Sequence, residues 1–125
     1  MTGPGARVRL SLGVLALALL AGACGPKAAP PRTAAQLAAL APADGRLAAL
    51  YETSCKGCHA NPAAGAPLVQ DKAAWSPRLN RGLPVLVSHV VTGYKGMPPG
   101  GQCSACSADD YTALVKFLSA QEGAQ

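Results

Sequence analysis

Hydrophobic residues recur at helical spacing in the stretch before the first cysteine pair. Leu47, Leu50 and Tyr51 stand at positions i, i+3 and i+4 of one helical face. Asp44 precedes them at a place where its carboxylate can accept hydrogen bonds from the first free N–H groups of a helix. The pattern therefore predicts a helix that begins after Asp44 and leads into Cys55.

A second amphipathic stretch lies toward the other end of the sequence. Ser107 is followed three places later by Asp110, which has the form of a capping box with Asp in place of the usual Glu. Four large hydrophobic residues then share one helical face: Tyr111, Leu114, Phe117 and Leu118. This stretch predicts a helix that begins after Ser107.

The segment from Pro84 to Gly93 is ambiguous in its local preferences. Pro84 suits the first position of a helix and Gly93 suits the position just past its end. Four valines, at 85, 87, 90 and 91, favour a strand instead. No partner strand is evident, so we predict a helix here, and Gly- and Pro-rich loops at 61–67 and 93–101.

The first 23 residues have the three parts of an export signal. Arg7 and Arg9 precede an apolar run over residues 10–20, which is shorter than the about 20 residues needed to span a bilayer. Small residues at 21–23 form a cleavage site before Cys24, and they also resemble the lipobox of bacterial lipoproteins, whose cysteine carries a lipid. We expect a signal peptide over 1–23 and a lipid on Cys24, with plain secretion and an uncleaved anchor as alternatives.

Composition and charge change once the signal is removed. The whole chain carries 11 Lys and Arg against 6 Asp and Glu, a formal charge of +5, and the loss of Arg7 and Arg9 reduces it to +3. The remaining cations occur singly, which argues against nucleic acid as a partner. Residues 24–43 are rich in Pro and Ala and predict a tether, so the folded domain is expected over 44–125. With one Trp and one Phe in the chain, another large apolar body should complete its core.

Residues 55–59 read Cys-Lys-Gly-Cys-His, the spacing by which c-type haem is attached to a chain. Two thiols at this spacing reach the two vinyl groups on one porphyrin edge, and the adjacent imidazole binds the iron. We therefore assign thioether bonds to Cys55 and Cys58 and an iron bond to His59. A disulfide or a metal knuckle is the alternative, and neither requires the histidine.

A haem iron bound by His59 needs a ligand on its other face. Met97 is the sole methionine once Met1 leaves with the signal, and prolines stiffen the backbone beside it. His89 is the only other histidine, and an ordinary surface or partly buried role is expected for it. Met97 is therefore the predicted second ligand, with His89 as the alternative.

Cys103 and Cys106 repeat the spacing without a following histidine. Export places them in a compartment that permits disulfides, and we predict a disulfide that rigidifies the segment after Met97, contributing about 2 kcal/mol. A four-cysteine zinc site is one alternative, although the 44 residues between Cys58 and Cys103 exceed the about 15 to 20 that are typical. A catalytic redox pair is another, although the βαβ pattern that usually accompanies it is absent from the sequence.

Trp75 and Arg78 both carry N–H donors that can reach haem propionates. A buried propionate charge is costly without such donors. The competing interpretation places Trp75 in the core and Arg78 on the solvated surface. The sequence leaves both interpretations open.

Taken in order, these motifs resemble those of the class I c-type cytochromes, most closely the cytochrome c5 group. The resemblance covers roughly residues 44–119 and rests on the segments 55–59, 65–67, 71–78 and 97–107. It implies two thioethers, axial His59 and Met97, a Cys103–Cys106 disulfide, a helical segment at 84–92, and terminal helices that cross beside the haem. The tether with Cys24 is an addition to that pattern.

The predicted fold is all-α, with three to four short helices and loops around one covalent haem c. With His59 and Met97 both bound, the iron has no open position for a substrate. We therefore expect a periplasmic single-electron carrier rather than an enzyme, docking transiently with redox partners such as respiratory complexes, oxidases or reductases. The alternatives are a haem enzyme or gas sensor with a displaceable Met97, and a zinc or disulfide-stabilised binding module.

Overall fold

A computed structural model of the chain describes residue 3 and residues 30–121. The predicted signal segment, apart from Gly3, and Cys24 lie outside the described residues. Residues 31–121 belong to one compact unit. Its described residues form helices and loops, and their one β feature is an isolated bridge between Tyr94 and Met97. In residue 3 and residues 30–121, no helix has both the length and the apolar character needed to cross a membrane.

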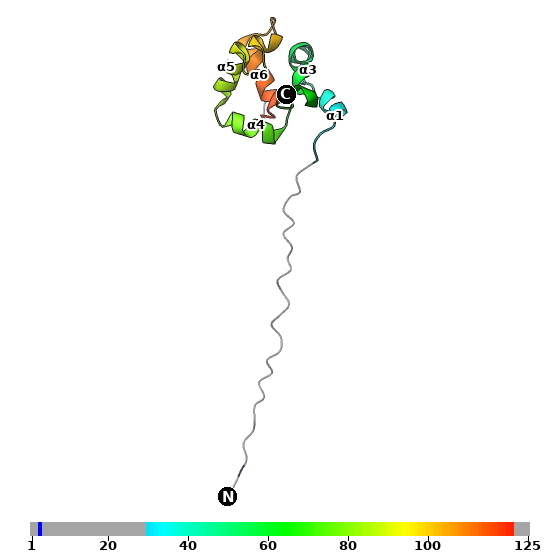
Figure 1. Cartoon of the computed structure of the whole chain (residues 1–125), viewed down its shortest axis with the longest axis vertical. Coiled ribbons are helices and arrows are strands. Elements are labelled where there is room, and N and C mark those ends of the chain that lie inside the picture. Colours follow the sequence, from blue (N-terminus) through cyan, green and yellow to red (C-terminus); the bar gives the residue numbers. More distant parts are fainter. Residues whose placement is uncertain (1–2, 4–29, 122–125) are drawn as a thin grey trace. The chain divides into compact units, whose positions relative to one another are not determined.

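Short helices make up the regular structure of this unit, as Figure 1 shows. In chain order the elements are α1 (Ala34–Ala38), α2 (Gly45–Leu50), η1 (Tyr51–Cys55), α3 (Lys56–His59), η2 (Pro62–Ala64), α4 (Lys72–Leu79), α5 (Leu83–Thr92), η3 (Pro99–Gln102) and α6 (Ala108–Leu118). η1 is a π-helical turn, whereas η2 and η3 are 3₁₀ turns. The all-α prediction is confirmed.

The helix predicted before Cys55 is present and extends further, because α2, η1 and α3 follow one another without a break. Asp44 caps its start by accepting a 2.8 Å hydrogen bond from the backbone N–H of Leu47. The π-helical turn forms where the N–H of Lys56 donates to the carbonyl of Tyr51, five residues back. The haem-attachment motif therefore lies on the last turns of one continuous helix.

The other two predicted helices are also confirmed. At the start of α6, Ser107 and Asp110 form the capping box, each side chain accepting from the other residue's backbone N–H. α5 carries Pro84 in its first turn and ends before Gly93, which has a positive φ of 83°. The strand that the valines favoured does not form in α5, because the helix packs against α4, η3 and α6 instead. Figure 1 shows α5 and α6 side by side.

Two structural features go beyond the sequence predictions. α4 forms over a segment with no predicted element, where Asp71 accepts from the N–H groups of Ala73 and Ala74 at its start. The packed unit also begins earlier than the predicted start at Asp44, because Leu37 on α1 is only 2% exposed. Arg32 adds a 3.3 Å hydrogen bond to the carbonyl of Gln70. Part of the predicted tether thus packs on the domain.

The core lies where α2 and η1 meet α6. The rings of Tyr51 and Phe117 pack edge to face with centroids 5.1 Å apart. Arg46 on α2 forms a two-pronged ion pair with the buried carboxylate of Asp110 on α6. The first and last long helices are thereby held together, as the resemblance implied, and the haem-attachment motif follows directly from this contact.

Candidate functional site

His59 is held by the loop that follows η2. Its ring is 8% exposed, and its Nδ1 atom lies 2.8 Å from the carbonyl oxygen of Pro67. Because a carbonyl can only accept, this hydrogen bond places the proton on Nδ1 and leaves the lone pair of Nε2 available to a metal. The N–H of Val69 donates to the His59 carbonyl at 2.7 Å and ties the same loop to the backbone of α3.

Burial lowers the pKa of His59 below its ordinary value of 6.5, and the positive charge of Arg78 lowers it further. The hydrogen bond to the Pro67 carbonyl raises the pKa, but by less than burial lowers it. The neutral imidazole is therefore the favoured form. A neutral imidazole is the form that binds iron.

Cys55 and Cys58 stand three residues apart on this helix, and neither is in a disulfide in the structure. Burial raises the pKa of the Cys55 thiol to about 11, whereas Cys58 is exposed. Helical spacing places the two thiols on one face. The disulfide alternative for this pair is therefore not the arrangement that the structure adopts.

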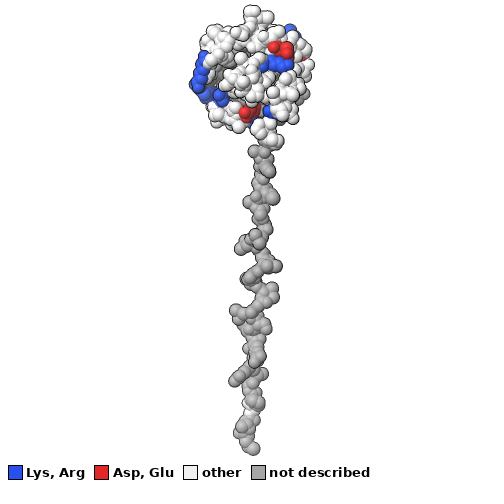
Figure 2. All heavy atoms as spheres, turned by 45° about the vertical axis from the view of Figure 1, so that its right-hand side comes forward, with Lys and Arg blue, Asp and Glu red and all other residues white. Residues whose placement is uncertain are grey.

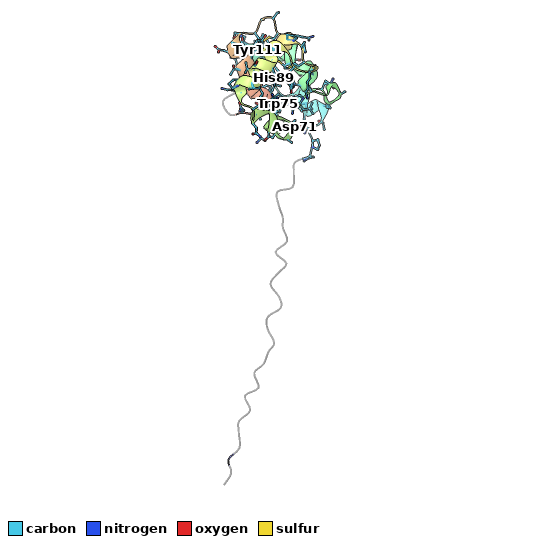
Figure 3. All side chains as sticks on the ribbon, turned by 60° about the vertical axis from the view of Figure 1, so that its left-hand side comes forward. Asp71, Trp75, His89 and Tyr111 are labelled. Atoms are coloured by element: carbon cyan, nitrogen blue, oxygen red, sulfur yellow. A yellow bond between two sulfur atoms is a disulfide. The ribbon has the colours of Figure 1, made fainter. Side chains whose placement is uncertain are left out.

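Trp75 lies beside His59 on the Pro67 side. The two rings are stacked with centroids 5.9 Å apart, and the indole N–H donates a 2.7 Å hydrogen bond to the carbonyl of Leu68. The same residues 67–69 therefore bind both Trp75 and His59. Asp71, the residue that caps the start of α4, lies near Trp75 in Figure 3, and its carbonyl accepts a 2.9 Å hydrogen bond from the backbone N–H of Trp75.

Arg78 is an exposed residue on the next turn of α4 and donates to the carbonyl of Ala74. It lies near enough to His59 to affect the pKa of that ring. Trp75 and Arg78 thus both lie on the His59 side of the site. The single indole N–H of Trp75 is bound to Leu68, whereas the guanidinium of Arg78 has further N–H donors besides the one bound to Ala74.

Met97 stands in a tight turn just after α5. Backbone hydrogen bonds of 3.0 Å run in both directions between Tyr94 and Met97 and close this turn. The segment after it, η3, contacts both α5 and η1. The structure therefore brings the chain after Met97 against the π-helical turn that carries Cys55.

The end of the Met97 segment is fixed to α6. Cys103 and Cys106 are placed as a disulfide with their Cα atoms 5.4 Å apart. The hydroxyl of Tyr111 on α6 donates a 2.9 Å hydrogen bond to the carbonyl of Cys103. Gly100 has a positive φ of 68°, and a Cβ there would lie 3.0 Å from the Tyr111 hydroxyl.

His89 is engaged with a residue of the Met97 turn. Its ring stacks on that of Tyr94 with centroids 3.9 Å apart and an interplanar angle of 13°.

The zinc alternative finds no support in residue 3 or residues 30–121, where His, Cys, Asp and Glu side chains form no group of three or more able to hold a metal ion.

The donors at this site fit a c-type haem. Two thiols on one helical face, a neutral imidazole with its Nδ1 proton held by a carbonyl, and a thioether in a braced turn match the groups by which proteins attach and ligate haem. Sequence reasoning missed the partners that hold these donors, which are Pro67, Leu68, Tyr94 and Tyr111. Pro67, Tyr94 and Tyr111 stood in segments that the sequence singled out, but nothing local showed what each would bind.

A family model described as "Cytochrome C oxidase, cbb3-type, subunit III" matches residues 42–118. The chain is 52% identical over 48 residues to cytochrome c-555 of Chlorobaculum tepidum, over 38% of this chain and 44% of that protein. It is 34% identical over 67 residues to cytochrome c5 of Ectopseudomonas mendocina, over 52% of this chain and 77% of that protein. The chain thus spans less than half the length of the first of these relatives.

The fold is similar to that of a cytochrome c solved in a crystal structure of an electron transfer complex with nitrite reductase. The match has a TM-score of 0.55 and 35% sequence identity, and it covers 62% of this chain and 95% of that one.

Proposed function

The chain belongs to the family of cytochrome c domains whose model it matches over residues 42–118, and from this premise we propose that it is a single-electron carrier with one covalent haem c. Its relatives named cytochrome c5 and cytochrome c-555 share this family. The fold is that of a small cytochrome c.

The observation that carries the proposal is the environment of His59. A buried, neutral imidazole whose Nδ1 is bound to the Pro67 carbonyl presents Nε2 as a ligand, directly after two thiols on the same helix. The thiols of Cys55 and Cys58 would hold the haem, each by addition across one vinyl group, with the sulfur bonding to one carbon and the thiol hydrogen passing to the other. The bound haem supplies a one-electron iron couple.

Met97 is the proposed second ligand. Its turn is closed by two backbone hydrogen bonds to Tyr94, and the following segment contacts the helix that carries Cys55. A thioether ligand favours a comparatively high reduction potential. With His59 and Met97 both bound to it, the iron would offer no coordination site to a substrate, which is the basis for proposing a carrier and not an enzyme.

Arg78 is proposed to bind a haem propionate. It is exposed, it carries several N–H donors, and it lies near His59. Trp75 is proposed to act on the same side by packing on His59, with its N–H holding the loop through Leu68. To bind a propionate, the indole N–H would have to give up its hydrogen bond to the Leu68 carbonyl.

The proposed location is the periplasm, with export directed by residues 1–23 and a lipid on Cys24. This proposal rests on the sequence pattern alone. Cys24 and residues 1–23, apart from Gly3, lie outside the residues that the structure describes. The short tether between Cys24 and the packed unit would keep the domain near the membrane surface.

Redox proteins that dock transiently are the proposed partners. The structural neighbour was solved in an electron transfer complex with nitrite reductase, which supports a partner of the reductase or oxidase class. One face of the molecule is largely uncharged, with Lys and Arg gathered at one edge and otherwise near acidic side chains, as Figure 2 shows. Such a surface predicts modest electrostatic steering and weak, brief contact.

Intact mass of the protein purified from its host tests attachment. We expect the mass of one haem per chain and of acyl chains on Cys24. A Cys103–Cys106 disulfide should lower the mass by that of two hydrogens. A Cys55→Ser, Cys58→Ser variant should lose the covalent haem, whereas the matched Cys103→Ser, Cys106→Ser variant should keep it. Covalent haem retained by the first variant would contradict the assignment.

The ligand assignment is tested separately by Met97→Leu, which preserves volume. The ferric protein should lose the weak red absorption band of a thioether-bound haem, and the ferrous protein should gain carbon monoxide binding. An unchanged spectrum would contradict Met97 ligation and favour His89.

A further inference from the structure

Two backbone hydrogen bonds close the turn that carries Met97. The N–H of Tyr94 donates to the carbonyl of Met97, and the N–H of Met97 donates back to the carbonyl of Tyr94, both at 3.0 Å. Lys95 between them has a positive φ of 54°, a conformation that a non-glycine residue adopts at some cost. The position of Met97 is therefore tied to the position of Tyr94.

Gly93 brings this turn against the end of α5. A Cβ at Gly93 would lie 3.0 Å from the backbone nitrogen of Pro99 and 3.1 Å from the carbonyl oxygen of Met97. Both are backbone atoms, so they cannot move aside as a flexible side chain can. Only glycine permits this close approach, and its φ of 83° also favours glycine.

The ring of Tyr94 is held from outside the turn. It stacks on His89, which lies on α5 one turn before the end of the helix, and the Lys95 ammonium group lies 5.5 Å from the ring centroid. Tyr94 is 38% exposed, so burial holds the ring only in part. The His89 ring is carried by α5, a helix that packs on α4, η3 and α6.

We propose that His89 and Tyr94 are positioning residues for Met97, holding its thioether at the iron through the stacked rings and the Tyr94–Met97 backbone bridge. The inference rests on the proposed function, because it takes Met97 as an axial ligand. It also gives His89 a role other than ligation. Displacement of Met97 from the iron becomes easier when the turn can move, and the stacked rings and the backbone bridge restrain the turn.

Imidazole binding to the ferric holoprotein measures this hold, because imidazole reaches the iron only when Met97 leaves. Titration is followed by loss of the red thioether band. We expect His89→Ala and Tyr94→Ala each to raise imidazole affinity by about two- to tenfold, the range of an aromatic pair. Tyr94→Phe keeps a ring of the same shape and should bind imidazole as the wild type does.

Two further variants make the test specific. The double variant His89→Ala, Tyr94→Ala should bind imidazole no more tightly than either single variant, because one pair interaction is lost in all three. Val91→Ala is the matched control, since Val91 is 50% exposed on the same helix and is outside the stack. It should leave imidazole affinity unchanged.

The inference is overturned if the single variants bind imidazole as the wild type does, if their effects add in the double variant, or if Val91→Ala has an equal effect. Failure of the proposed function looks different. If the wild-type ferric spectrum lacks the thioether band, Met97 is not a ligand. If His89→Ala loses low-spin ligation and the other variants keep it, His89 binds the iron. Either result would overturn the inference together with its premise.

Discussion

Removal of one hydroxyl, in Tyr111→Phe, should loosen the attachment of the Met97 segment to α6. The Tyr111 hydroxyl donates a 2.9 Å hydrogen bond to the carbonyl of Cys103, a residue that is itself buried. Phenylalanine keeps the ring but leaves that carbonyl without its side-chain donor. The change therefore tests a single interaction between the helix and the loop.

The expected cost can be worked from this geometry. A net hydrogen bond contributes about 0.5–1.5 kcal/mol, and the Cys103 carbonyl keeps its 3.3 Å hydrogen bond from the backbone N–H of Cys106, so we expect a loss of about 0.5–1.5 kcal/mol. In a folded unit of this size each kcal/mol lowers the melting temperature by about 4–8 °C. Guanidinium unfolding of the oxidised holoprotein, followed by far-UV circular dichroism, should show a lower midpoint with an unchanged slope.

Tyr51→Phe is the matched control because it removes the same atom from another buried ring. The Tyr51 side chain is 0% exposed, and its hydroxyl has no hydrogen-bond partner among the residues described. The control should therefore leave the unfolding midpoint unchanged or raise it. Equal losses in the two variants, or no loss in Tyr111→Phe, would refute the reasoning.

Three other predictions concern stability and use the same unfolding assay. Leu37→Ala should cost about 2–5 kcal/mol because the side chain is buried, and a loss below about 0.5 kcal/mol would mean that α1 is not part of the folded unit. Ser107→Ala should cost about 1 kcal/mol through loss of the bond that Ser107 Oγ accepts from the N–H of Asp110, and full stability would rule out that cap. The ion pair with Arg46 holds the pKa of Asp110 well below its usual 3.8. The ion pair therefore stabilises the folded state fully above about pH 4, and this stabilisation is lost as pH falls through the lowered pKa. Asp110→Asn should accordingly have a lower free energy of unfolding than the wild type at pH 7, and this difference should become smaller in acid. A difference that is the same at every pH would contradict the ion pair.

The parts of the fold that could be predicted from the sequence depend on local signals. Caps such as Asp44 and the Ser107 capping box act within three residues, and the apolar spacing after them marks one helical face. α4 was missed because Pro77 lies inside it and Trp75 is its one buried side chain, so neither periodicity nor propensity identified the helix.

In the candidate site, too, some residues could be predicted from local signals and others could not. The residues that bear its chemistry stand in short motifs, and the spacing of Cys55, Cys58 and His59 is set by the chemistry itself. Their supports come from elsewhere in the chain, as when the Pro67 carbonyl orients His59 and Leu68 accepts from Trp75. Such contacts join positions with no common local pattern, and only the folded chain brings them together.

Carbon monoxide addition to the ferrous holoprotein tests the central claim most directly. If His59 and Met97 both hold the iron, the visible spectrum should be unchanged by carbon monoxide, as expected for a carrier with no open coordination position. Tight binding by the untreated protein would contradict this account, since it would mean that Met97 is displaceable and that the haem is a site for ligand or substrate.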